Sequence, residues 1–509
     1  MLFSSVRPRH LLSSALLLGC ATSALSAATT EAPAPPPNVL FIAIDDLRTE
    51  VGAWGRVRAL TPHIDQLARE GVQFNRAYAQ YPLCNPSRVS LLTGRYPRTT
   101  ELYGNRDYFN AWYPDWVSLP KYFKQHGYTT IRSGKIFHGD LIDDGEAWTI
   151  GGVITRFDAP RPERIVAERP ITAAEEAERL ATMRAADIER AAGSDYWKAV
   201  EDPAELARLG DTVSTDVAIE HLQKWKPGDA PFFIGLGLVK PHSPLVAPKQ
   251  FFDLYDADSL DLPVDFAKRP TVPEGFPVAS IRAINADLFI ERDATPAESR
   301  DMIRAYLACT SYTDHNVGRV IAALDEAGLR ESTIIVLWSD HGYQLGEKGK
   351  WSKAGSLWEE GVHVPMIILD PRAAGNGQAS PRVVELLDLY PTLADLSGLP
   401  VPTEVEGRSL RPLLDDPDAT WDHPAYAVWS ERNRGLSGVV VRTERWRYAE
   451  FFGPGAGSFL TDAVNDPHEL TNLVDDPRYA EVVAELRPLA RAHVEGKTEP
   501  TPTDWVEQR

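Results

Sequence analysis

Short apolar runs that are followed within two positions by an acidic or lysine residue constrain this chain of 509 residues more than any other feature. Residues 38–44, 231–239, 333–338 and 364–369 are continuous apolar runs with the length of buried strands. Helical patterns lie between several of them. Strands that alternate with helices predict an α/β fold, with a mostly parallel sheet covered by helices on both faces.

The chain changes character after about residue 416, and this change predicts a second, smaller part. We expect short antiparallel strands there, packed by a terminal helix. The predicted domains are a catalytic α/β domain over 38–415 and an α+β subdomain over 416–509. Further predicted elements are a strand at 128–131, helices at 117–126, 212–225, 299–326 and 383–396, C-terminal strands at 425–430, 437–443 and 446–452, and a final helix at 478–493.

Polar side chains with catalytic or metal-binding chemistry follow the ends of these strands. In open α/β sheets, binding sites form beyond the carboxyl ends of the strands. Taken one at a time, such residues are more often an Asp turn or a solvated Lys or His. Their joint occurrence at four strand ends favours a site. The residues are Asp45 and Asp46, Lys135 and His138, His242, and Asp340 with His341.

The segment from residue 84 to residue 95 has the pattern of a nucleophile at the start of a helix. Cys84 is followed by Pro86, which fits the first helical turn, and then by Arg88. An anion near Cys84 would meet the helix N-terminus and the guanidinium of Arg88 together. The ordinary interpretation is a buried inert cysteine. A disulfide between Cys84 and Cys309 is a competing interpretation.

The composition is that of a globular protein with a formal net charge of −19. This charge argues against broad binding to nucleic acid or to anionic membranes, which needs a basic surface. An anionic substrate must therefore be held by a local cluster of positive groups.

The N-terminus has the pattern of a targeting segment. Residues 1–27 are predicted to be a signal peptide, because basic residues precede an apolar run that is too short to span a bilayer. Cys20 stands at the end of a sequence similar to a lipobox, so a lipid anchor there is an alternative. Residues 28–37 form a Pro/Ala-rich tether. We expect an exported protein, periplasmic or secreted, without a membrane span.

Cys84-x-Pro86-Ser87-Arg88, continued by Leu-Thr-Gly-Arg at 92–95, resembles the signature of type I sulfatases. The resemblance extends over nearly the whole mature chain and implies an alkaline-phosphatase-like α/β fold. In this family a separate formylglycine-generating enzyme oxidises the cysteine to formylglycine. Residue 84 would then be a hydrated aldehyde. One of its hydroxyls would attack sulfur to give a covalent sulfo-enzyme, which later collapses to expel sulfate.

The resemblance also implies roles for the strand-end residues. One Ca²⁺ would be bound at oxygen-rich ligands, and because an imidazole ligand is unusual for Ca²⁺, Mg²⁺ remains an alternative. The implied ligands are Asp45, Asp46, residue 84, Asp340 and His341. Arg88, Lys135 and Lys353 would offset the sulfate charge. His242 or Lys353 would protonate the departing sugar oxygen, and His138 would take the proton from the second hydroxyl.

Within the family the likeness is greatest to iduronate-2-sulfatases, because Asp340-His341 stands where many sulfatases have Asp-Asn. The loops at 100–115 and 150–211, which would line the substrate cleft, differ in content. The resemblance thus implies a carbohydrate sulfatase, acting on 2-O-sulfated uronic acids of a glycosaminoglycan or algal polysaccharide. The alternatives are a phosphonate or phosphodiester hydrolase or a choline-type sulfatase of the same superfamily, and a non-catalytic glycan-binding relative.

Overall fold

The computed structural model describes residues 35–55, 58–138, 144–151, 196–226, 228–431 and 435–497. The chain divides into a short unit, Met1–Pro35, and a second unit, Pro36–Arg509, which contains every element described below. The expected signal peptide, the lipobox at Cys20 and most of the tether lie outside the described residues. Most of the segment at 150–211 lies outside them as well.

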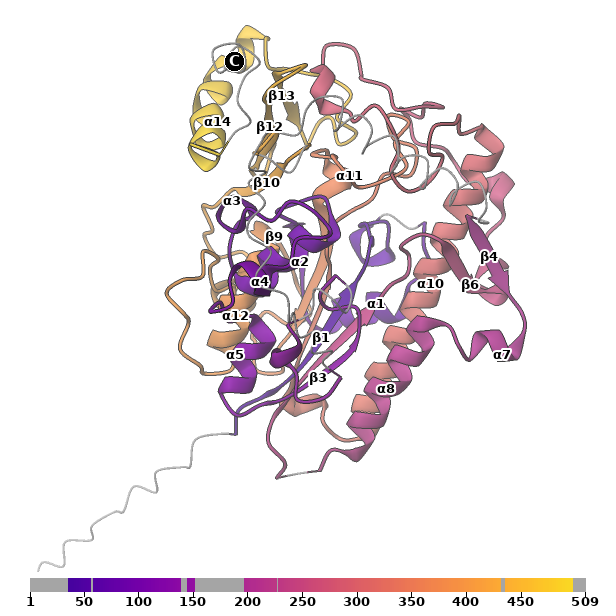
Figure 1. The fold of residues 1–509 in the computed structure, drawn as a ribbon, viewed down its shortest axis with the longest axis vertical. Coiled ribbons are helices and arrows are strands. Elements are labelled where there is room, and N and C mark those ends of the chain that lie inside the picture. Colours follow the sequence, from indigo (N-terminus) through magenta and orange to yellow (C-terminus); the bar gives the residue numbers. More distant parts are fainter. Residues whose placement is uncertain are drawn as a thin grey trace, which may run out of the picture. The chain divides into compact units, whose positions relative to one another are not determined.

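The large sheet contains seven described strands in the order β3-β5-β1-β7-β8-β2-β9 (Figure 1). Of these, β8 is antiparallel to both of its neighbours, and the other pairs are parallel. The predicted fold class, a mostly parallel sheet flanked by helices, is confirmed. The strands are β1 (Asn38–Ile44), β2 (Val72–Tyr78), β3 (Thr129–Gly134), β5 (Phe232–Leu238), β7 (Thr333–Ser339), β8 (His363–Leu369) and β9 (Ala379–Glu385).

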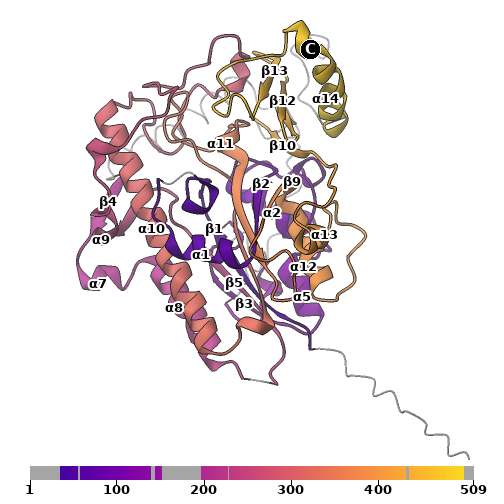
Figure 2. The same cartoon turned by 180° about the vertical axis from the view of Figure 1, so that it is seen from behind.

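Alternate residues of the central strand β1 pack into two separate cores, because side chains of a strand point to opposite faces. Val39 and Phe41 belong to the core on the side of α2, α5 and α12, whereas Leu40 and Ile42 belong to the core on the side of α1, α8 and α10 (Figures 1 and 2). Both faces of the sheet are therefore covered. This explains why β1 is apolar along its whole length.

The helices mostly match the predicted ranges, with one correction. Residues 383–385, predicted as the start of a helix, belong to β9, which pairs with β2. β9 contains Pro381, and an edge strand tolerates proline. The helices are α1 (Pro62–Glu70), α2 (Cys84–Thr93), α3 (Pro97–Thr100), α4 (Phe109–Trp112), α5 (Leu119–Gln125), α7 (Pro203–Leu206), α8 (Gly210–Lys224), α9 (Lys249–Phe252), α10 (Pro296–Glu326), α11 (Glu359–Val362), α12 (Leu389–Leu396), α13 (Arg411–Asp415) and α14 (Ala480–His493).

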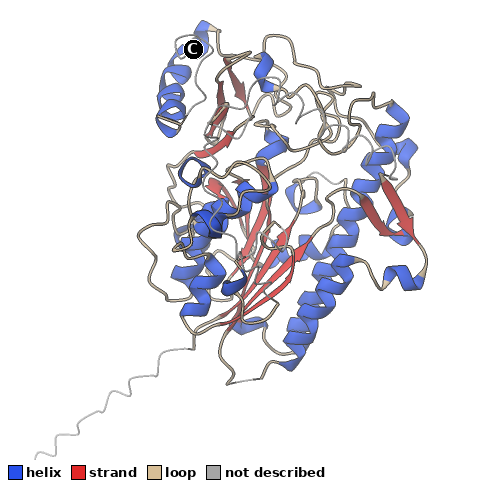
Figure 3. Cartoon of the chain, viewed as in Figure 1, coloured by secondary structure: helices blue, strands red, loops and turns tan. Residues whose placement is uncertain are grey.

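A second, antiparallel sheet contains four described strands and is packed by α14, as predicted (Figure 3). One of its strands, β13, was not predicted. Two further short strands pair beside α10. The strands of the antiparallel sheet are β10 (Ala425–Trp429), β11 (Gly438–Arg442), β12 (Trp446–Phe451) and β13 (Gly457–Asp462), and the short pair is β4 (Trp197–Val200) with β6 (Leu245–Pro248).

Among the described residues, no helix has both the length and the apolar character that a membrane crossing requires.

Candidate active site

The carboxyl ends of β1, β5 and β7 meet at one edge of the large sheet and bring the predicted acidic residues together. The backbone N–H of Asp45 donates to the carbonyl of Leu238 at the end of β5, and the N–H of Asp340 donates to the carbonyl of Ile44 at the end of β1. Asp46 has a left-handed backbone with φ of 63°, a conformation that Asp adopts more readily than most residues. Asp45, Asp46 and Asp340 are all fully buried.

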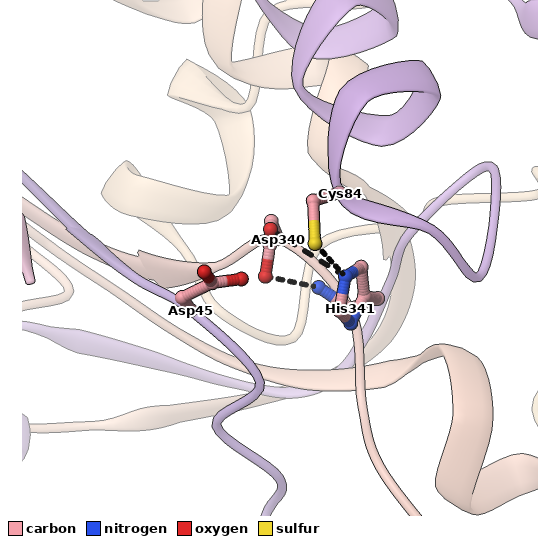
Figure 4. Close-up of side chains that lie close together, drawn as sticks. All are labelled: Asp45, Cys84, Asp340 and His341. Carbon is pink, nitrogen blue, oxygen red and sulfur yellow. Dashed lines mark hydrogen bonds and ion pairs between the residues drawn. The ribbon is translucent and has the colours of Figure 1, made fainter. Parts of the chain in front are cut away.

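Cys84 is the first residue of α2, and its sulfur points at this cluster of carboxylates (Figure 4). The Nε2 atom of His341 lies 3.3 Å from Sγ of Cys84. The hydroxyl of Ser87 donates to the carbonyl of Asp340, which fixes the first turn of α2 against the end of β7. Cys84 and Cys309 are both buried free thiols, so the alternative of a disulfide between them is not observed.

Arg88 joins the helix to the strand ends from a fully buried position. Its Nε donates to Oδ2 of Asp340 at 2.8 Å, and its Nη1 donates to the carbonyls of Lys135 and Ile136 at 2.6 and 2.9 Å. Its Nη2 lies 3.7 Å from Oδ1 of Asp45 and has no hydrogen-bond partner. Part of the guanidinium is thus committed to holding the site, and Nη2 remains to face a ligand.

Two lysine ammonium groups face the two adjacent carboxylates. Lys135, which follows β3, donates to Oδ2 of Asp45. Lys353 comes from the loop after β7 and donates to Oδ2 of Asp46 at 3.0 Å. Lys353 is almost completely buried, whereas 16% of the Lys135 side chain is exposed. The site is therefore lined by cations on two sides of the carboxylate pair.

The two predicted histidines differ in their surroundings. His242 follows β5, and its Nε2 lies 3.9 Å from Oδ2 of Asp46. The Nδ1 atom of His138 is buried without a hydrogen-bond partner. Burial, with the nearby charge of Lys135, lowers the pKa of His138 to about 3. The imidazole is therefore neutral at ordinary pH.

The electrostatics of the cluster are those of a crowded anionic site. Burial raises the pKa of Asp46 to about 7, although Lys353 and His341 oppose the shift. Burial acts in the same direction on Asp45, but the charges of Lys135, His242 and Arg88 outweigh it and hold the pKa of Asp45 well below its usual range. One carboxylate is thus firmly ionised and its neighbour is not.

The charges around Cys84 favour its anionic form. Burial raises the pKa of the thiol, but Lys135, Lys353 and His341 together lower it below its usual value. Burial would likewise lower the pKa of His341, yet Asp340 and Cys84 raise it to about 10. In the absence of a metal ion, the imidazolium of His341 therefore neutralises its anionic neighbours.

The donor set fits a divalent cation. One ligand atom from each of Asp45, Cys84, Asp340 and His341 lies within 4.8 Å of the others, and a second such group contains Asp46 and His242. Oδ1 of Asp45 and Oδ1 of Asp46 are buried without hydrogen-bond partners. Buried carboxylate oxygens with no donor are costly unless a cation binds them.

Several residues that support the site were not identified from the sequence. The hydroxyl of Tyr306 in α10 donates to the carbonyl of Asp46 and accepts from the N–H of Arg48. Both carboxylate oxygens of Asp211 accept backbone N–H groups, at 2.8 Å, from Val239 and Lys240 and so fix the loop that leads to His242. These residues lie far away in the sequence from the residues they support, and no local signal indicates them.

This arrangement, a mostly parallel sheet with a cysteine at a helix N-terminus above a carboxylate and histidine cluster, is that of an α/β protein with a candidate metal-binding site. A sulfatase family model matches residues 37–399, and a model described as N-sulphoglucosamine sulphohydrolase, C-terminal, matches residues 346–494. The chain belongs to the sulfatase family and is a sulfuric ester hydrolase.

Individual proteins show the same similarity. Iduronate 2-sulfatase of Homo sapiens is 35% identical over 86% of this chain and 90% of its own length. A solved structure described as a 2-O GAG sulfatase superposes with a TM-score of 0.65 at 23% identity and covers 90% of this chain and 92% of that one. A phosphonate monoester hydrolase from Silicibacter pomeroyi superposes with a TM-score of 0.68 at 24% identity, over 90% and 95% of the two chains. The two superpositions support the fold alone.

Proposed function

We propose that this protein hydrolyses sulfate esters of carbohydrates, with 2-O-sulfated uronic acid residues of a glycosaminoglycan or algal polysaccharide as its substrates. The observation that carries the proposal is the group formed by Cys84, Asp45, Asp340 and His341, in which the ligand atoms lie within 4.8 Å of one another. The choice of sugar is supported by the identity of 35% to human iduronate 2-sulfatase.

We place formylglycine at residue 84, where one hydroxyl of its hydrate supplies the nucleophile for sulfur. Its formation requires a formylglycine-generating enzyme as a partner during maturation. A Ca²⁺ ion, or Mg²⁺, held by Asp45, Asp46, Asp340 and His341 would supply positive charge to a sulfate oxygen. The buried Oδ1 atoms of Asp45 and Asp46, which have no hydrogen-bond partner, support this placement.

The chain's own residues then bind the ester and move its protons. Arg88 Nη2, Lys135 and Lys353 surround the position of the sulfate and offset its charge. His242 or Lys353 donates a proton to the departing sugar oxygen. His138, whose Nδ1 is free and whose imidazole is neutral, accepts a proton when sulfate leaves.

We further propose that the enzyme is exported to the periplasm or secreted, since residues 1–27 have the pattern of a signal peptide. An anchor at Cys20 is the alternative to a free exported form. In this proposal residues 38–415 form the catalytic domain and residues 416–509 the C-terminal subdomain.

A mass spectrum of the tryptic peptide that carries Cys84, together with assays, tests the proposal. We expect a formylglycine mass and no reaction with a thiol reagent. We also expect release of sulfate from a 2-O-sulfated uronic acid disaccharide and from an aryl sulfate. An active preparation with an unmodified Cys84 thiol would rule out the formylglycine mechanism.

The second candidate is a phosphonate or phosphodiester hydrolase, which the superposition on the phosphonate monoester hydrolase supports at the level of fold. Hydrolysis of an aryl phosphonate monoester at a higher kcat/KM than the aryl sulfate would favour this candidate over the sulfatase.

A further inference from the structure

Asp287 lies beside the proposed active site but has no part in the mechanism described above. It belongs to the loop before α10, and its Oδ2 lies 3.6 Å from Nζ of Lys353. This oxygen is buried and has no hydrogen-bond partner, and 16% of the side chain is exposed. A buried carboxylate oxygen that faces a buried ammonium requires an explanation. Burying such an oxygen is costly unless it stabilises the charge that it faces.

Hydrogen bonds to Trp351 hold the segment around Asp287 beside Lys353. The side chain of Asn285 accepts from the N–H of Trp351 at 2.9 Å, and the N–H of Leu288 donates to the carbonyl of the same tryptophan at 3.3 Å. These bonds flank Asp287 on both sides, and Trp351 stands two residues before Lys353. The loop that carries Asp287 and the segment that carries Lys353 are therefore hydrogen-bonded to each other. These bonds limit how far the carboxylate and the ammonium can separate.

Lys353 is shared between two carboxylates of different kinds. Oδ2 of Asp46 lies 3.0 Å from its Nζ, but Asp46 belongs to one of the groups of candidate metal ligands found among the described residues. Asp287 belongs to neither of those groups. A cation bound at Asp46 would take up the charge of that carboxylate and repel Lys353, so Asp287 would be the anion that still balances the ammonium.

We propose that Asp287 is a positioning residue that holds the ammonium of Lys353 in the active site, and that its negative charge limits how tightly the site binds sulfate. The inference rests on the proposed function, in which Lys353 acts on the ester. It explains why a fourth carboxylate lies near a site built for an anion. The carboxylate weakens the binding of the sulfate product while keeping the lysine ready to act on the leaving oxygen.

The two effects have opposite signs, which separates this role from a merely structural one. Replacing Asp287 by Asn keeps the size of the side chain and removes its charge. Turnover should fall, because Lys353 is no longer oriented. Binding of inorganic sulfate should become tighter, because a repulsive charge is lost. General damage to the site would weaken both turnover and binding.

The experiment uses the full matured chain and compares Asp287→Asn, Asp287→Glu and Lys353→Ala with the wild type. Asp293→Asn is the matched control, because Asp293 lies on the same loop and pairs with Arg269 at the surface. For Asp287→Asn we expect kcat on aryl sulfates to fall about tenfold or more without a rise in KM, with the loss growing as the leaving phenol becomes less acidic. Asp287→Glu should recover part of kcat, and Asp293→Asn should match the wild type.

Two further measurements complete the test. With Lys353 already replaced by Ala, adding Asp287→Asn should leave kcat unchanged, and an additional loss of the same size would overturn the proposal. Calorimetry with inorganic sulfate should show a severalfold lower Kd for Asp287→Asn than for the wild type, and an unchanged or higher Kd would also overturn it. If the wild type hydrolysed no sulfate ester, the proposed function would fail, whereas the sulfate calorimetry would still decide the role of Asp287. Circular dichroism identifies a variant that does not fold, in which case Asp287→Glu provides the comparison.

Discussion

The Nε2 atom of His341 lies 3.3 Å from the sulfur of Cys84, although the two residues are 257 positions apart in the sequence. The contact joins the start of α2 to the loop after β7. It places the residue proposed for modification beside a proposed metal ligand. Chemistry at residue 84 and binding of a cation are therefore expected to depend on each other.

Metal binding should release a proton from His341. In the protein with an unmodified Cys84 and without a metal, burial lowers the pKa of this imidazole, but Asp340 and Cys84 outweigh burial and raise it to about 10. The ring is therefore protonated at neutral pH, and a cation binds only the neutral form. We expect Ca²⁺ affinity to increase about tenfold for each pH unit between about 7.5 and 9, where one proton is displaced, and more steeply below pH 7, where Asp46 must also lose its proton. Calorimetry in two buffers of different ionisation enthalpy measures the released proton. His341→Asn, which has no such proton, should bind with less proton release, and equal release in both proteins would refute the assignment.

Replacing Cys84 should abolish activity without unfolding the protein. Cys84→Ala removes the only side chain proposed to provide the nucleophile, and we expect kcat to fall at least about 10³-fold. The matched control is Cys309→Ala. Cys309 is the second buried free thiol among the described residues and lies in α10, where burial raises its pKa to about 12. This control should keep activity near that of the wild type. Comparable losses in the two variants would point to packing instead of chemistry.

His493 in α14 should make the protein less stable in acid. Its ring is buried and stacks on Tyr426 at 4.2 Å between centroids, and burial, with the charge of Arg98, lowers its pKa to about 3. The unfolded state therefore binds a proton between about pH 6.5 and pH 3 while the folded state does not, so the free energy of unfolding falls as the pH falls through this window. The loss should be about 2 kcal/mol between pH 6.5 and pH 5.

Denaturant titrations of His493→Phe at several pH values test this assignment. The variant should show a flatter dependence of the free energy of unfolding on pH than the wild type. His63→Gln, a change at an exposed histidine, should keep the slope of the wild type. An identical slope in the wild type and His493→Phe would contradict the prediction.

Glu359 should be important for stability, because it connects α11 to the antiparallel sheet. Its carboxylate accepts from Tyr78 at 2.7 Å, from Arg442 at 3.2 Å and from Arg447. Although burial raises its pKa, the two arginines outweigh burial and hold that pKa well below its usual range. Glu359→Gln leaves the buried guanidinium of Arg442 without its anion, whereas Arg447 keeps only its pair with Glu469 at 3.1 Å. We expect this change to lower the free energy of unfolding by about 3–5 kcal/mol.

Chemical denaturation measures that loss. The matched control is Glu444→Gln, because Glu444 also pairs with an arginine, Arg382, but at the surface. Its effect should be much smaller. If the two variants lowered the free energy of unfolding equally, the prediction that the buried carboxylate of Glu359 contributes more than a surface carboxylate would be wrong.

The apolar runs predicted the central sheet well, because a strand buried on both faces has almost no polar residue to obscure it. Each of β1, β5 and β7 was found in this way, and so were the acidic and histidine residues that follow them. β2 and β9 were missed, since they contain Asn75, Arg76 and Pro381 and have no such continuous run. The predicted helix that began at residue 383 was wrong at its start, because the pairing of residues 383–385 with β2 overrides the local helical pattern.

The sequence by itself determined which residues we propose for the chemistry, because a motif around Cys84 and the residues after each strand can be recognised one segment at a time. Only the tertiary structure decided how these residues are oriented and balanced. Asp287 faces Lys353, and Asp211 fixes the loop before His242. Arg88 donates most of its hydrogen bonds to Asp340 and to backbone carbonyls. These relationships join segments far apart in the chain, and the charge that each residue feels depends on burial and on neighbours that no local pattern specifies.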